Sequence, residues 1–133
     1  MRLSTPAGIK SKIEKINNWE YKYPDIVINI YDAISNEKIG YLDLERYNNK
    51  YITHSFLDER YRGKGIGLYM YIKALRWCLK NNHRVTSSGC SSSDAQKIWR
   101  SKTLRKHFNI KVKYSYSAPT WYVYKKMTLI ERL

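Results

Sequence analysis

Hydrophobic and polar positions follow a strand-like pattern through much of the first half of the chain. β-Branched, aliphatic and aromatic residues there either run together or alternate with polar ones, which is typical of strands. Turn-forming residues divide this stretch into three segments: 26–31, 39–44 and 51–57. Because only short turns join the segments, we expect an antiparallel meander of three strands.

The period then changes to that of a helix. Apolar side chains recur at helical spacing over residues 66–82, and a short strand is expected at 84–87. After it, Ser93 is predicted to cap a second helix, with Gln96 completing a capping-box pattern three residues later. The inner face of that helix is predicted to carry Ala95, Ile98 and Trp99.

The two ends of the chain complete the order of elements. A weak first helix is expected over residues 9–19, and two last strands near 110–116 and 121–126, with a turn at 117–119. The pattern therefore predicts an α/β (α+β) fold with a mixed, mostly antiparallel sheet flanked by helices. A length of 133 residues predicts one domain over residues 1–133.

Composition narrows the class of protein. Hydrophobic residues make up 43% of the chain, which excludes a wholly disordered protein. Cys78 and Cys90 are the two cysteines, too few for a disulfide scaffold, so a reducing compartment is expected. No apolar run approaches the ~20 residues that a membrane span requires. We therefore expect a cytoplasmic protein without a membrane partner.

Charge is distributed unevenly. The chain carries a net charge of +14. Residues 1–59 hold eight Lys or Arg and nine Asp or Glu, whereas residues 60–130 hold sixteen Lys or Arg and a single acid, Asp94. This asymmetry predicts a polyanionic partner, either a nucleic acid or an acidic or nucleic-acid-associated protein. The alternative is a solvated basic surface that only maintains solubility.

Three glycines lie close together where the third strand leads into the long helix, in the run Arg62-Gly63-Lys64-Gly65-Ile66-Gly67. Glycines allow close backbone approach, and a helix N-terminus directs unpaired N–H groups at an anion. With Arg60 adding a further cation, the run predicts a pyrophosphate cradle. It lacks the Walker pattern, and its GxGxG spacing after a meander strand differs from a dinucleotide fingerprint.

This run resembles the acyl-CoA loop of the GNAT superfamily of N-acetyltransferases, whose pattern is Arg/Gln-x-x-Gly-x-Gly/Ala. Arg60, Gly63 and Gly65 match it, and so do Arg62, Gly65 and Gly67. A later run, Ala95-Gln96-Lys97-Ile98-Trp99, resembles the family's following helix, and the resemblance covers about residues 51–108. The N-terminal region is short for the family, so its first strand is expected to be missing or irregular.

The resemblance implies a GNAT-like fold and an enzyme that transfers the acetyl group of acetyl-CoA directly to an amine. Backbone N–H groups of the loop would hold the pyrophosphate, and Phe56 and Leu57 would bond the pantetheine arm. Ser92 or Ser93 would also contact that arm, and one of Arg100, Lys102 or Arg105 would meet the 3′-phosphate. The implied cofactor-binding residues are Phe56, Leu57, Arg62, Gly63, Lys64, Gly65, Ile66, Gly67, Leu68 and Ser93.

The catalytic residues are less clearly marked. Trp99 stands where the family often has a tyrosine acid, and since an indole cannot usefully give up a proton, we assign it to packing. His54 and Glu59 are the candidate bases, because an imidazole titrates near pH ~6.5 and a carboxylate often serves in the family. Asp43, Glu45, Asp58 and a water-mediated route are alternatives, and His54 could simply fill a strand position.

Several partners remain open at this stage. The acceptor amine could belong to a protein lysine, a protein N-terminus or an aminoacyl-tRNA. Two non-catalytic alternatives are a nucleic-acid-binding module and an acyl-CoA-binding interaction module on the same scaffold. His83, His107 and the two cysteines lack metal-ligand spacing, so no metal site is predicted. The oligomeric state is left open, a homodimer included.

Overall fold

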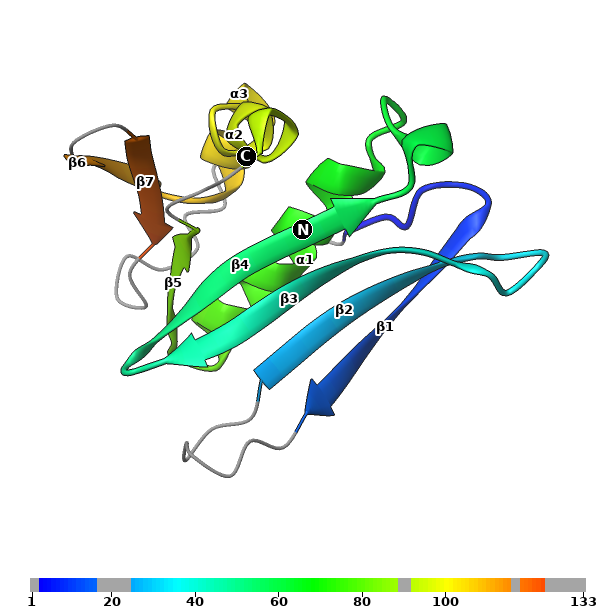
Figure 1. Ribbon diagram of the computed structural model, residues 1–133, viewed down its shortest axis with the longest axis horizontal. Helices are drawn as coiled ribbons and strands as arrows, with labels where there is room; N and C mark the ends of the chain where they lie inside the picture. Colours follow the sequence, from blue (N-terminus) through cyan, green and yellow to red (C-terminus); the bar gives the residue numbers. More distant parts are fainter. Residues whose placement is uncertain (1–2, 17–24, 89–91, 116–117, 124–133) are drawn as a thin grey trace.

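A computed structural model describes residues 3–16, 25–88, 92–115 and 118–123, which form a seven-stranded mixed sheet flanked by helices (Figure 1). The elements in chain order are β1 (Ile9–Ile16), β2 (Asp25–Asp32), β3 (Lys38–Tyr47), β4 (Lys50–Leu57), the 3-10 turn η1 (Glu59–Tyr61), α1 (Ile66–Lys80), β5 (Arg84–Ser87), α2 (Ser93–Trp99), α3 (Lys102–His107), β6 (Lys111–Ser115) and β7 (Ala118–Val123). The sheet order is β1-β2-β3-β4-β5-β7-β6, and only the β4–β5 pair is parallel. The predicted fold class is confirmed.

The central meander forms as predicted. β2, β3 and β4 pair antiparallel in sequence order. Asn36 and Asn48 occupy the two connecting turns with positive φ values of 63° and 54°. Asparagine tolerates this left-handed region better than most residues, so these two positions suit tight reversals of the chain.

The N-terminal prediction was wrong. Instead of a helix, residues 9–16 form β1, which pairs antiparallel with β2 from Ile9 opposite Asp32 to Ile16 opposite Asp25; the rest of the predicted helix, 17–19, lies outside the described residues. The expectation of a missing or irregular first strand was therefore also wrong. Pairing with the edge of β2 gives the main-chain groups of β1 hydrogen-bond partners. Local sequence pattern does not predict such a long-range contact.

Boundaries in the second half also needed correction. The N-cap of α2 is Ser92 rather than Ser93, and its hydroxyl accepts a 3.2 Å hydrogen bond from the backbone N–H of Ala95. A separate short helix, α3, follows with Ser101 as its cap and was not predicted. β7 begins at Ala118, so the turn predicted at 117–119 was wrong in its second half; residues 117 and 124–126 lie outside the described residues.

The core lies between one face of the sheet and α1. Alternating residues of β2, led by Ile28 and Ile30, are fully buried on this face, and α1 contributes Met70 and Leu75. Figure 1 shows α1 running behind β3 and β4, while α2 and α3 lie beyond the upper end of β5.

β4 extends beyond the end of its parallel neighbour, β5. Their parallel pairing runs from Lys50 opposite Arg84 to Thr53 opposite Ser87, where β5 ends. β4 continues to Leu57 while still paired with β3 on its other side. Among the described strands none pairs with the free edge of β4 beyond Thr53, so main-chain groups there face a groove.

Candidate active site

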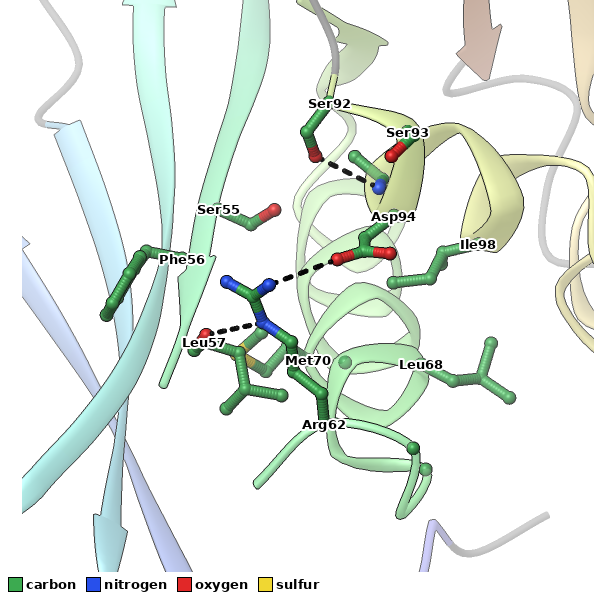
Figure 2. Close-up of a pocket in the computed structure, with 14 residues that line it drawn as sticks. Ser55, Phe56, Leu57, Arg62, Leu68, Met70, Ser92, Ser93, Asp94 and Ile98 are labelled. Atoms are coloured by element: carbon green, nitrogen blue, oxygen red, sulfur yellow. Dashed lines mark hydrogen bonds and ion pairs between the residues drawn. The ribbon is translucent and has the colours of Figure 1, made fainter. Parts of the chain in front are cut away.

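A groove of about 590 Å³ lies where β4 parts from β5. Its walls are the last residues of β4, the glycine loop with the first turn of α1, and the start of α2 (Figure 2). Eight of the predicted cofactor residues line it: Phe56, Leu57, Arg62, Gly63, Gly65, Gly67, Leu68 and Ser93. Six further residues line it: Ser55, Met70, Asp94, Ala95, Ile98 and Ser92, the last of which was predicted as the alternative to Ser93.

The glycine loop closes one end of the groove. Gly63 and Gly65 have φ values of +75° and +80°, and a Cβ built at either would meet nothing within 4 Å. These glycines are therefore required by backbone conformation and leave open space for a ligand. Gly67 differs, because its Cβ would lie 3.0 Å from Cδ1 of Ile98, so its small size allows α2 to approach α1.

The first turn of α1 presents hydrogen-bond donors at this end. Gly65 is the N-cap and gives no side-chain cap, and the first intrahelical bond runs from the N–H of Tyr69 to the Gly65 carbonyl at 3.1 Å. The preceding N–H groups of the turn therefore have no acceptor within the helix. Together with the positive end of a 15-residue helix, they make a site suited to phosphate.

Arg62 crosses the groove between its two long walls. Its Nε donates a 3.0 Å hydrogen bond to the Leu57 carbonyl of β4, and a terminal nitrogen lies 3.4 Å from a carboxylate oxygen of Asp94 on α2. Figure 2 shows the guanidinium between these two partners. A cation is thus held in the groove close to the first turn of α1.

Three other residues of the loop do not form its wall. Arg60 turns away to pair with Asp58 at 3.0 Å and with Glu37 at 3.5 Å. The Lys64 ammonium lies over the Tyr61 ring, 5.6 Å from its centroid. Ile66 is buried in the core. The loop pattern matches the sequence twice, once from Arg60 and once from Arg62. Only the match that starts at Arg62 has its arginine in the groove.

A smaller cavity of about 170 Å³ adjoins the groove, sharing Ser55, Ser92 and Ala95 with it. Its other lining residues are Thr53, His54, Tyr71 and Ser88. Six of its seven lining residues carry a hydroxyl or an imidazole side chain. It provides room for small polar groups next to the free edge of β4.

The two predicted bases are separated by the fold. His54 borders the smaller cavity, and its Nε2 lies 3.2 Å from a carboxylate oxygen of Glu45. Asp43 is its cross-strand partner; burial raises the pKa of Asp43, and the nearby His54 opposes that shift. Glu59 is exposed in η1 and lines neither cavity. His54 alone of the pair is placed at the site.

Trp99 occupies a packing position. It is fully buried, stacks on Trp121 with ring planes 8° apart, and meets the Tyr71 ring edge-on with centroids 5.6 Å apart. Its Nε1 is buried without a hydrogen-bond partner among the described residues. The ring does not line the groove, which agrees with its assignment to the core.

Exposed basic residues follow one another along the chain from α2 onward, the helix whose start forms one wall of the groove, and are together called the basic surface. It consists of exposed residues of α2, α3 and β6 and of the junctions between them: Lys97, Arg100, Lys102, Arg105, Lys106, Lys111 and Lys113. No acidic residue interrupts the sequence from Lys97 to Lys113.

Within the described residues no group of His, Cys, Asp and Glu side chains gathers in a way that could hold a metal ion. None of the described helices has the length and apolar character of a membrane-spanning segment.

Solved structures share this fold. A GNAT-family acetyltransferase from Bacillus anthracis aligns with a TM-score of 0.57 at 10% identity, covering 75% of this chain and 66% of its own. An acetyltransferase from Salmonella typhimurium that modifies the N-terminal serine of a 50S ribosomal subunit protein gives 0.51 at 16% identity, covering 75% and 63%. A ribosomal alpha-N-protein acetyltransferase in complex with coenzyme A gives 0.52 at 18% identity, covering 81% and 63%.

This chain thus spans 63 to 66% of the length of those three proteins. The comparison with curated proteins gives no significant match. The family model described as the acetyltransferase (GNAT) family matches residues 5–99, which include the meander, the glycine loop, α1 and α2. The sheet order, the parted strands and this match over most of the chain lead to one conclusion: the chain belongs to the acetyltransferase (GNAT) family.

Proposed function

We propose that this protein is an N-acetyltransferase that moves the acetyl group of acetyl-CoA directly to an amine. The observation that carries the proposal is the groove itself, which joins an anion-binding helix terminus to a free strand edge. A pyrophosphate fits the first of these features and an amide-bearing arm fits the second. Acetyl-CoA supplies the activated thioester, and GNAT acetyltransferases use it as donor.

Different parts of the groove would bind different parts of acetyl-CoA. Backbone N–H groups of the loop and of the first turn of α1 would hold the pyrophosphate, with Arg62 moving from its protein partners to the phosphates. Main-chain groups of Phe56 and Leu57 would bond the pantetheine amides as an added strand does, and Ser93, which also lines the groove, would contact the same arm. Holding donor and acceptor together supplies much of the rate acceleration by proximity.

His54 is proposed as the group that accepts the proton of the attacking amine. It is among the residues that line the smaller cavity next to the free edge of β4, and a carboxylate oxygen of Glu45 lies 3.2 Å from its Nε2. His54→Ala should remove the acid limb of the pH–rate profile and leave acetyl-CoA binding intact. A profile of unchanged shape would exclude His54 and leave water or a carboxylate as the proton acceptor.

The acceptor amine is proposed to belong to a nucleic acid, such as an aminoacyl-tRNA, or to the N-terminus of a protein that sits on one. The basic surface supports this, because a lysine-rich acceptor would be repelled there whereas a polyanion would be attracted. One protein of similar fold modifies the N-terminal serine of a ribosomal protein. That makes a free N-terminal serine a suitable first acceptor to assay.

Two measurements test the proposal together. Acetyl-CoA at a hundredfold excess over its dissociation constant should stabilise the fold by about 2.7 kcal/mol. Thiol release should then be followed with a serine-initiated peptide, a lysine peptide and an aminoacyl-tRNA. Stabilisation without release from any acceptor would instead indicate an acyl-CoA-binding interaction module. No stabilisation at all would indicate a basic binding module on this scaffold.

A further inference from the structure

The smaller cavity brings a buried tyrosine of α1 to the edge of the groove. Tyr71 is 1% exposed, and its hydroxyl shares a 2.9 Å hydrogen bond with the Ser55 hydroxyl on β4. Ser55 lines both the groove and the smaller cavity, whereas Tyr71 lines only the smaller one. The two hydroxyls therefore form a chain that leads from the groove into the core.

Ser55 lies at the position where the reacting atoms are expected. β4 and β5 stop pairing at Thr53 and Ser87, and Ser55 is the next residue of β4 on the face that packs toward α1. A donor arm that follows the free edge of β4 past Leu57 and Phe56 reaches Ser55 at the inner end of the groove. Figure 2 shows the Ser55 hydroxyl turned toward the groove side of β4.

We propose that Ser55 and Tyr71 form a proton relay to the departing thiolate, with Ser55 as the catalytic residue at the sulfur and Tyr71 as the positioning residue behind it. This rests on the proposed function. As the C–N bond forms and the C–S bond breaks, the bonding pair stays on sulfur, which takes the proton of Ser55. Ser55 takes the phenolic proton of Tyr71, and the phenolate regains one from solvent. The proton lost by the amine leaves through His54 or water.

The surroundings of Tyr71 favour this role. Trp99 fills the position that resembles the family's tyrosine, and its indole cannot deliver a proton. The Tyr71 ring packs edge-on against Trp99, so a phenol reaches the same region from α1 instead. Burial raises the pKa of Tyr71, although hydrogen bonds to Ser55 and Thr53 oppose the shift. The hydroxyl consequently carries its proton at neutral pH, and its hydrogen bond with Ser55 stabilises the phenolate that the relay forms transiently.

The structure offers a matched control on the same helix. Tyr69 is also buried, but its hydroxyl bonds Ser11 of β1 at 2.9 Å, away from both cavities. Tyr71→Phe and Ser55→Ala should each lower kcat by roughly 100-fold, while Tyr69→Phe keeps it within twofold. Ser55→Thr retains a hydroxyl and should recover most of the loss. The affinity for acetyl-CoA, measured by thermal shift, should stay within twofold in all four variants.

A comparison of leaving groups separates proton delivery from a structural effect. Acetylation of a serine-initiated peptide, and acetyl-CoA hydrolysis without any acceptor, should both show the loss. 4-Nitrothiophenyl acetate releases a weakly basic thiolate that departs without a proton, so the variants should use it as well as the wild type does. Equal losses with both donors, or a Tyr71→Phe kcat within twofold of wild type, would overturn the relay. A wild type inactive with acetyl-CoA would refute the proposed function first, and the relay with it.

Discussion

Gly65→Asp tests whether the end of the groove is an anion site. Gly65 caps α1 with φ +80° in a region that is open to at least 4 Å around a built Cβ. An aspartate there would be strained by about 1–2 kcal/mol, as for any L-residue in left-handed backbone. It would also place a carboxylate where the pyrophosphate is expected. The backbone strain should therefore lower the stability of the fold, whereas the added carboxylate should weaken acetyl-CoA binding.

The expected loss of binding follows from Coulomb's law. Two unit charges about 4 Å apart repel by about 1 kcal/mol in water and about 4 kcal/mol in a protein-surface environment. A pyrophosphate presents about two such charges, so even the aqueous limit gives about 2 kcal/mol. Since 1.4 kcal/mol is tenfold in affinity, the dissociation constant for acetyl-CoA should rise by roughly 30-fold or more. Gly65→Ala adds only the strain and should leave binding much closer to wild type.

Gly8→Asp provides the control for strain. Gly8 also has φ +80° with nothing within 4 Å of a built Cβ, but it precedes β1 and lies outside the groove. Thermal unfolding should show similar destabilisation of the two aspartate variants. Isothermal titration with acetyl-CoA should show weakened binding only for Gly65→Asp. Equal affinities in the two variants would mean that the helix terminus holds no phosphate, and the loop assignment would be wrong.

Three further predictions address the groove wall, the basic surface and acid stability. Asp94→Asn removes the half-exposed ion pair with Arg62, worth about 0.2–1 kcal/mol, and frees the Arg62 guanidinium for phosphate. Calorimetry should therefore show acetyl-CoA affinity rising by up to about fivefold, and weaker binding would contradict this. Arg105→Glu with Lys106→Glu should weaken acceptor binding but not acetyl-CoA binding. RNA affinity should also fall with salt at a log–log slope of about −0.7 per contacted phosphate, and a flat salt response would refute the role. Hydrogen bonds led by one from the Ser35 backbone lower the pKa of Asp32 to about 2, so its contribution to stability is present above pH 3.8 and is lost as pH falls toward 2; Asp32→Asn should flatten that part of the acid-unfolding curve.

The sequence predicted those elements whose signals are local. The meander has the two-residue period of a sheet. The glycine loop needs positive φ at Gly63 and Gly65, and the close spacing of its glycines in the sequence predicts such a turn. β1 shows the limit of this reasoning. Ile9, Ile13 and Ile16 fit helical spacing, but in the strand only Ile9 is buried, and Ile16 is 51% exposed. Pairing with β2, not local pattern, decided the conformation.

The parts of the site that were missed are joined by tertiary structure. α3 buries only Leu104 among its six residues, which is too little apolar signal to define a period. Asp94 and Arg62 meet only because α2 packs beside the loop. Glu59 is adjacent to the loop in sequence, yet η1 turns it into solvent. Ser55 could have been found, because strand alternation places it on the same face as Thr53, toward α1.

The proposed donor site is built mainly from main-chain groups, and this explains why it is easier to recognise than the proposed acceptor site. Loop N–H groups and the free edge of β4 depend on glycines and on sheet order, both of which tolerate extensive change in side chains. Three solved structures of this fold align with the chain as a whole at only 10 to 18% identity. On the proposed function, the acceptor would instead be selected by side chains, namely His54, the hydroxyls of the smaller cavity and the basic surface. Exchanging those side chains should change the acceptor while the fold continues to hold acetyl-CoA, so affinity for the donor and choice of acceptor should vary independently across variants.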